Sequence, residues 1–201
     1  VYHCCHMLFF QNLIVEFVAL LSISELDALY KDTHSVINAK QVIAFMVADE
    51  RNPSSVASCL KAARDNARAV RGALTTEVWE TQNQTWLELS QLLKSKAYDT
   101  DPTKFFEWVK FRSHLSRGVA IGTMLQDEAY NFVRMGTFLE RADNTARLID
   151  VKFHSDVDPS SLTSHYARKT TKAGEVTSQA ADFYYWSAIL RSVSGFEIYR
   201  K

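Results

Sequence analysis

The chain has few residues that break helices and no excess of one charge sign. Its 201 residues include only three prolines and six glycines. Because these residues punctuate turns, their scarcity between long periodic segments argues against a turn-rich β fold. Lys plus Arg and Asp plus Glu each number 23, so the formal net charge is zero. No overall field therefore draws the chain to nucleic acid or to an anionic membrane.

Cysteine is also scarce, with three residues and no framework spacing: Cys4, Cys5 and Cys59. An odd count of this kind predicts reduced thiols and a cytoplasmic location. Residues 3–6 read His-Cys-Cys-His, but four consecutive side chains do not easily converge on one zinc ion, whose ligands are normally spaced across loops. We predict no metal site and no cofactor.

Long apolar runs and familiar catalytic motifs are missing. Gln11, Asn12 and Glu16 interrupt the most apolar segment, residues 7–23, and its uninterrupted runs are too short to span a bilayer. It also lacks the basic start and cleavage site of a signal peptide, so we interpret it as a buried helix and expect no membrane partner. The chain has no Gly-rich phosphate loop, Gly-x-Ser-x-Gly elbow, His-Glu-x-x-His pair or Glu-x-x-His pair.

Apolar residues at helical spacing predict a single all-α domain, a multi-helix bundle of about six to seven helices. The predicted helices cover residues 7–23, 39–49, 55–72, 75–94, 102–122, 127–153 and 180–200. Residues 22–38 and 98–101 are predicted as connections, and Gly118 and Gly122 as a loosened helix end. Residues 154–179, rich in Ser, Thr, Lys and Asp, predict a flexible loop within the domain.

Two charged helix faces are the candidate sites. The first is a basic stripe on helix 55–72, at spacings of three, four and three residues: Lys61, Arg64, Arg68 and Arg71. The second lies on helix 127–153, where Glu140, Asn144 and Arg147 cluster with Asp143 and Asp150 on their flank. The opposite face of that helix is predicted to enter the core: Met135, Phe138, Ala142, Ile149 and Phe153.

Several interpretations of these faces remain open. Pairs such as Asp143 with Arg147 add only about 0.2–0.5 kcal/mol on an exposed helix, although solvated faces often carry them. A buried ionic seam between the two faces would specify helix register, and the basic stripe alone could bind an anion. Alternatively, the chain is an enzyme that acts on an amino or carboxyl substrate, with Glu140 and Asp143 as acid and base.

Nucleic-acid binding is a further alternative. Basic residues are interleaved with Phe105 and Trp108 on helix 102–122: Lys104, Lys110, Arg112, His114 and Arg117. Such a surface can stack single-stranded bases. The aromatic residues recur at helical period, which favours burial in the core, and the zero net charge also counts against this function.

Several motifs, in order over residues 39–201, resemble the bacterial Alpha-E domain family. They lie at residues 52–55 with 59–71, 106–110 with 113–115, 136–152 and 186–197. The resemblance implies an all-α, bacterial, cytoplasmic protein of poorly defined function, with no established catalytic residues. It maps the family's Glu-Arg-Ala-x-Asn-x-Ala-Arg element to Glu140, Arg141, Ala142, Asn144, Ala146 and Arg147.

The resemblance also implies partners. Such proteins are linked by gene neighbourhood or fusion to ATP-grasp-like and transglutaminase-like proteins, which implies an accessory module in peptide synthesis or modification. The expected binding face comprises Glu140, Arg141, Asp143, Asn144 and Arg147 together with Arg64, Arg68 and Arg71. Family members usually begin with an earlier helix that carries another copy of the element and continue beyond residue 201, so we expect a domain truncated at both ends.

Overall fold

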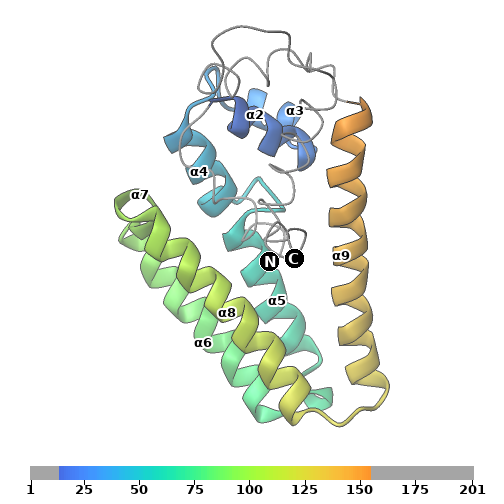
Figure 1. The fold of residues 1–201 in the computed structure, drawn as a ribbon. Helices are drawn as coiled ribbons and strands as arrows, with labels where there is room; N and C mark the ends of the chain where they lie inside the picture. Colours follow the sequence, from blue (N-terminus) through green and yellow to red (C-terminus); the bar gives the residue numbers. More distant parts are fainter. Residues whose placement is uncertain (1–13, 155–201) are drawn as a thin grey trace, which may run out of the picture.

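The computed structural model describes residues 14–154, which form eight α-helices and one 3-10 turn, with no strand in that range (Figure 1). The helices are α2 (Ile14–Ile23), α3 (Asp27–Lys31), α4 (Ala39–Ala48), α5 (Val56–Ala69), α6 (Thr76–Lys94), α7 (Ala97–Thr100), α8 (Pro102–Thr123) and α9 (Glu128–His154), and the 3-10 turn covers Arg71–Ala73. The all-α prediction is confirmed. The predicted loop after residue 154 and the predicted helix 180–200 lie outside the described residues.

Polar caps set the helix starts where the sequence predicts them. Ser55 Oγ accepts a hydrogen bond from the Ser58 amide at 3.1 Å, which caps α5. Asp101 Oδ1 accepts one from the Lys104 amide at 3.1 Å, with Pro102 in the first turn of α8. Each side chain satisfies an N–H group that the first turn of a helix leaves unpaired, so these boundaries depend only on local sequence.

Two segments predicted as connections contain short helices instead. In residues 22–38, α3 carries Tyr30, whose side chain is fully buried. Residues 98–101 overlap α7, which follows Lys96, a residue in a left-handed conformation with φ of 51°. Helices of four or five residues are too short to show a hydrophobic period, so the sequence pattern did not reveal them.

The glycines of α8 do not end that helix. Gly118 and Gly122 both lie inside it, and α8 continues to Thr123. Glycine costs roughly 1 kcal/mol relative to alanine in a helix, and packing against α6 along the length of α8 outweighs that cost. The helix ends at Thr123, one residue beyond the predicted end.

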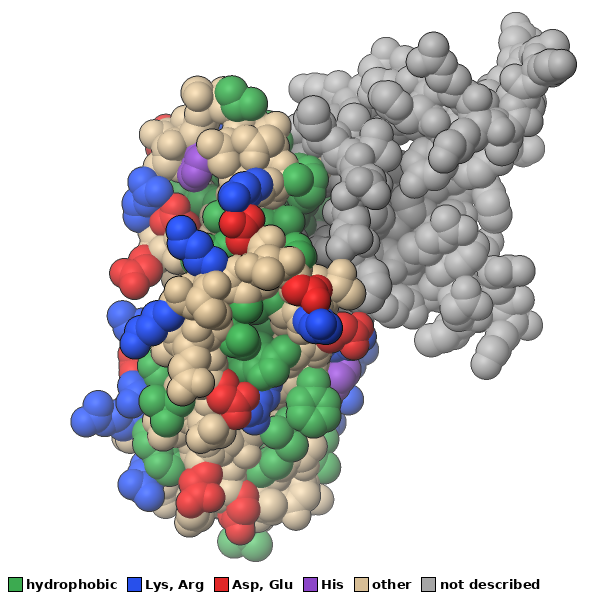
Figure 2. All heavy atoms as spheres, turned by 90° about the vertical axis from the view of Figure 1, so that its left-hand side faces the viewer, with side chains coloured by type: hydrophobic (Ala, Val, Ile, Leu, Met, Phe, Trp, Pro, Cys, Tyr) green, Lys and Arg blue, Asp and Glu red, His purple; other side chains and the backbone are tan. Residues whose placement is uncertain are grey.

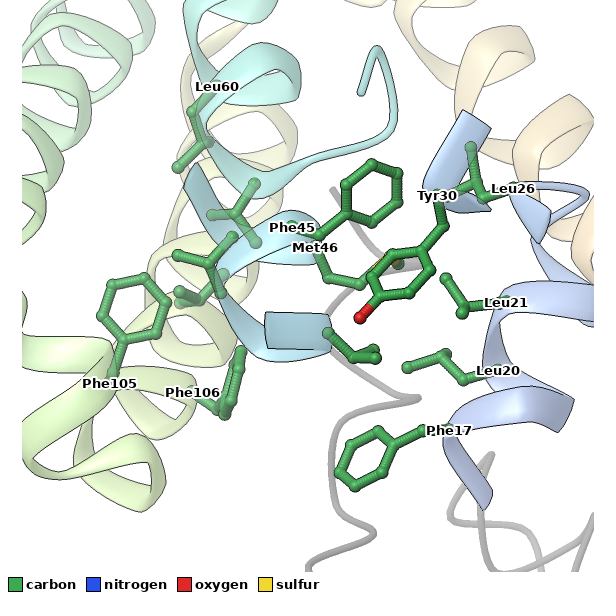
Figure 3. Close-up of a cluster of buried hydrophobic side chains, with 14 of the residues drawn as sticks. Phe17, Leu20, Leu21, Leu26, Tyr30, Phe45, Met46, Leu60, Phe105 and Phe106 are labelled. Atoms are coloured by element: carbon green, nitrogen blue, oxygen red, sulfur yellow. The ribbon is translucent and has the colours of Figure 1, made fainter. Parts of the chain in front are cut away.

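The main core lies where α8, α4 and the α2–α3 pair meet (Figure 3). Phe105 points inward from α8 and Phe45 from α4, while Leu21 and Tyr30 approach from the opposite side. The Tyr30 and Phe45 rings meet edge to face, with centroids 5.2 Å apart. Tyr30 Oη donates a hydrogen bond to the Val36 carbonyl at 3.0 Å, and burial raises the pKa of this phenol. Val42, Phe45, Met46 and Val47 of α4 are buried.

Helices α5, α6 and α8 form a packed group in which α6 contacts both α5 and α8. A small second cluster joins α6 to the end of α8 through Val78, Ala120 and Met124. Ala129 and Tyr130, at the start of α9, pack against this cluster. Asp127 Oδ1 accepts a hydrogen bond from the Tyr130 amide at 3.1 Å, as expected for the residue predicted to open this helix.

Helix α9 turns the opposite face inward from the one predicted. Met135, Phe138 and Ile149 are 49%, 52% and 45% exposed, and Ala142 is also exposed. Glu140, Asn144 and Arg147 are half-buried. Figure 1 shows α9 along one side of the molecule, and its contacts are mainly with α2. Period alone identifies an apolar face but cannot say what covers it, and within residues 14–154 the predicted core side chains Met135, Phe138, Ala142 and Ile149 are not buried.

Candidate binding groove

An open groove with a volume of about 390 Å³ lies between α9 and the group formed by α5, α6 and α8. Its exposed lining is mostly apolar. The apolar side chains of this lining include Leu60, Ala63, Ala67, Val70, Val78 and Ala120. Ala63 and Ala67 stand one turn apart on α5, and side chains this small leave space in front of the helix.

Helix α9 lines the groove with one stripe of residues. The stripe consists of Tyr130, Val133, Arg134, Thr137 and Glu140. These residues recur within three or four positions of one another, which places them on the same side of a helix. Glu140, singled out by the sequence, therefore lies at a concave surface and not on an open convex one.

The arginines that share the groove with Glu140 come from other positions than predicted. They are Arg112 and Arg117 on α8 and Arg134 on α9 itself. The Arg134 guanidinium lies over the Phe138 ring, 4.9 Å from its centroid. The signal for the α8 arginines was present in the sequence, because Arg112, Ser116 and Ala120 recur at helical spacing, but nothing indicated which helix they face.

Arg112 is held by an ionic network between α6 and α8. It forms an ion pair with Glu88 Oε1, which also accepts a hydrogen bond from Gln84 Nε2 at 3.0 Å. Trp108 Nε1 donates to Glu88 Oε2 at 3.1 Å. Arg112 is the main reason that the pKa of Glu88 is lowered, and burial opposes this effect. Only 13% of the Arg112 side chain is exposed, so it forms a fixed part of the groove wall.

Arg147 ties the far end of α9 to the rest of the fold. Its Nε donates to Asp143 Oδ2 at 2.8 Å, and a terminal guanidinium nitrogen lies 2.9 Å from Glu25 Oε2 in the α2–α3 turn. Asp143 first, and then Glu25, raises the pKa of Arg147. The Glu25 and Asp143 side chains are 73% and 57% exposed, so each contact is worth at most about 1 kcal/mol.

The structure thus separates the residues that the sequence grouped together. Arg141 is exposed and Asn144 half-buried, and neither is among the residues that line the groove. Arg64 Nε donates to Asn83 Oδ1 on α6 at 3.0 Å, while Lys61 and Arg68 are exposed. Arg71 is exposed too, and its guanidinium lies 5.3 Å from the centroid of the Trp79 ring. An ionic seam would need this stripe to face α9, whereas α5 meets the groove with its apolar side.

The basic residues of α8 near its start are paired locally. Lys104 lies 3.2 Å from Asp101, and Lys110 lies 2.9 Å from Glu107. Phe105 is buried, as expected if the aromatic period marks the core. Figure 2 shows acidic and basic side chains interspersed over the face of the molecule that it presents. This face offers no continuous basic surface of the kind that tracks a phosphate backbone.

Within the part of the chain that the structure describes, no three His, Cys, Asp or Glu side chains form a group that could hold a metal ion. Cys59 is half-buried, with its Sγ 3.7 Å from the Pro53 carbonyl oxygen. None of the helices between residues 14 and 154 has the length and apolar character needed to cross a membrane. Residues 3–6 lie outside this range.

Comparison with protein families assigns the chain. A family model described as a predicted α-helical domain with a conserved ER (Glu-Arg) motif matches residues 7–201. The chain belongs to the Alpha-E family. Searches among curated proteins and among solved structures find no match. The match extends further toward the N-terminus than the motifs found in the sequence alone.

Glu-Arg occurs twice in this Alpha-E domain, at residues 50–51 and 140–141. The first is in the turn between α4 and α5, where Arg51 forms an ion pair with Asp49 at 2.6 Å. The second is on α9, where Glu140 lines the groove and Arg141 faces solvent. Only the second dipeptide contributes a side chain to the groove.

Proposed function

We propose that this Alpha-E domain is a helical accessory module that binds a segment of a partner protein in the groove between α9 and the α5–α6–α8 group. The observation that carries the proposal is that Glu140, from one of the two Glu-Arg dipeptides, lines an open and mostly apolar groove. An apolar concave surface with a few convergent polar groups is typical of binding sites. Amphipathic segments of partner proteins commonly dock in such grooves.

The proposed setting is a bacterial peptide synthesis or modification system with ATP-grasp-like and transglutaminase-like proteins. This part of the proposal rests on the family resemblance of the sequence, because the groove itself indicates binding and does not name the partner. Membership in the Alpha-E family supports the helical architecture of the proposed module.

The arrangement favours binding over acid–base catalysis. Of the two carboxylates that an enzyme was predicted to use, only Glu140 lines the groove. Asp143 accepts a hydrogen bond from Arg147 instead. A general acid and a general base must both reach the reacting group of one substrate, and these two side chains do not share the groove.

A binding experiment with matched variants tests the proposal. The full chain is titrated calorimetrically with the ATP-grasp-like or transglutaminase-like protein encoded beside it. Ala63→Phe fills the groove and Glu140→Ala removes its carboxylate, whereas Glu80→Ala removes an exposed carboxylate of α6 outside the lining. We expect the two groove variants to bind at least about 10-fold more weakly, about 1.4 kcal/mol, and Glu80→Ala to bind normally.

Circular dichroism of each variant shows whether the helices remain folded. If Ala63→Phe and Glu140→Ala are folded and bind the partner protein as tightly as the unaltered chain does, the groove is not the binding site.

A further inference from the structure

The outward face of α9 carries a regular apolar seam that no described element covers. Phe132, Met135, Leu139, Ala142, Ala146 and Ile149 follow one another at spacings of three, four, three, four and three residues. All six are exposed, with Phe132 at 60% and Leu139 at 63%. This is the a/d spacing at which one helix packs along another. A seam of this length is unfavourable when it is exposed to water. Large exposed apolar patches of this kind mark interaction surfaces.

We propose that residues 180–200 of the same chain pack along this seam. Phe183, Trp186, Leu190 and Val193 recur at spacings of three, four and three residues. They repeat the period of the α9 seam over about three helical turns. Two helices with matching a/d stripes bury them against each other by knobs-into-holes packing.

The extent of the family match supports an intramolecular partner. The Alpha-E match runs through residue 201 without stopping at the end of α9, so residues 180–200 belong to the same domain. A helical domain is stable only when the apolar stripes of its helices cover one another. Between residues 14 and 154, α2 is the element that α9 contacts most, and the six side chains of the seam remain exposed.

The connecting segment is long enough for this return. Residues 155–179 span up to roughly 85 Å when extended. The 27 residues of α9 make a helix about 40 Å long. The segment 180–200 can therefore reach either end of the seam, in a parallel or an antiparallel direction.

A second copy of α9 would suit the seam less well. Asp143 and Asp150 follow d positions and so flank the seam on one edge, at e positions. In an antiparallel pair of α9 helices these carboxylates would face those of the other copy. In a parallel pair Asp143 and Asp150 would face Phe138 and Thr145, which offer no opposite charge.

Photo-crosslinking in the full chain tests the proposal. Benzoylphenylalanine is placed at Leu139 in an equal mixture of ¹⁴N- and ¹⁵N-labelled chains, and the crosslinked peptides are identified by mass spectrometry. The same probe at Lys61, an exposed position of α5, is the control. We expect crosslinks from residue 139 to residues 180–200 of the same isotopic label, at least ten times more abundant than from residue 61.

Three results overturn the proposal. These are crosslinks between chains of different label, crosslinks mainly to other parts of the chain, and a yield no higher than from the Lys61 probe. Met135 lies on the same seam one turn earlier. It replaces Leu139 as the probe position if circular dichroism shows that the first variant does not fold.

Discussion

The ionic network between α6 and α8 should contribute measurably to the stability of the fold. Glu88 receives hydrogen bonds or an ion pair from Gln84, Trp108 and Arg112. Glu88→Gln removes the charge opposite Arg112, whose side chain is only 13% exposed. Hydrogen bonds to charged groups are worth about 1.5–3 kcal/mol. Because Glu88 is 31% exposed and glutamine keeps one acceptor oxygen, we expect a loss of about 2 kcal/mol.

The chain contains a matched control on α8. Glu107 lies 2.9 Å from Lys110, but the two side chains are 54% and 39% exposed. Exposed ion pairs contribute little, so Glu107→Gln should lower the free energy of unfolding by less than about 0.5 kcal/mol. Urea unfolding followed by far-UV circular dichroism measures both. In a chain of this size, the loss in Glu88→Gln corresponds to a fall in Tm of roughly 4–8 °C.

The pH dependence gives an independent check. The pKa of Glu88 is lowered in the folded protein, mainly by Arg112. Its stabilisation is therefore fully present above the unfolded carboxyl pKa of about 4.3 and is lost as the pH falls through the lower folded value. The difference in free energy of unfolding between the unaltered chain and Glu88→Gln should shrink as the pH falls below about 4.3. Equal losses in the two variants, or a difference that does not shrink, would refute this account of Glu88.

Three smaller predictions concern local contacts. Gly118→Ala should raise the free energy of unfolding by about 0.5–1 kcal/mol, because a Cβ there meets no atom within 4 Å. A fall in Tm would contradict this. Asn52→Ala should cost about 1–3 kcal/mol in urea unfolding, since Asn52 is buried, donates to Phe45 O at 3.2 Å and accepts from the Ser54 amide at 2.9 Å. A loss below about 0.5 kcal/mol would refute it. Arg147→Ala should lower stability by at most about 2 kcal/mol, about 1 kcal/mol for each of its two contacts, yet speed amide exchange in α9. Unchanged exchange would show that Arg147 does not hold the helix.

Helix positions were predictable because their signals are local. Ser55 and Asp101 each cap a helix by accepting a bond from an amide three residues later. Such contacts need no tertiary partner. The short helix α3 was not predictable, since five residues show no period. Its conformation depends on the burial of Tyr30 against Phe45, 15 residues away in the chain.

The groove was predictable only in part. The sequence drew attention to Glu140, which does line the groove. It paired that residue with Arg64, Arg68 and Arg71, whereas Arg112 is the nearly buried arginine of the wall. Spacing shows which residues share one helix face, but the partner of that face depends on how helices pack.

Helix α9 shows most clearly what each level determined. The sequence by itself determined that residues 128–154 form a helix with an apolar side and a charged side, because helical period alone decides which side chains point together. The tertiary structure decided which side turns inward. Packing of Tyr130 at one end and the contact between Arg147 and Glu25 at the other orient the helix, and both join residues far apart in the chain. Glu140 consequently faces the groove, and Leu139 beside it faces outward.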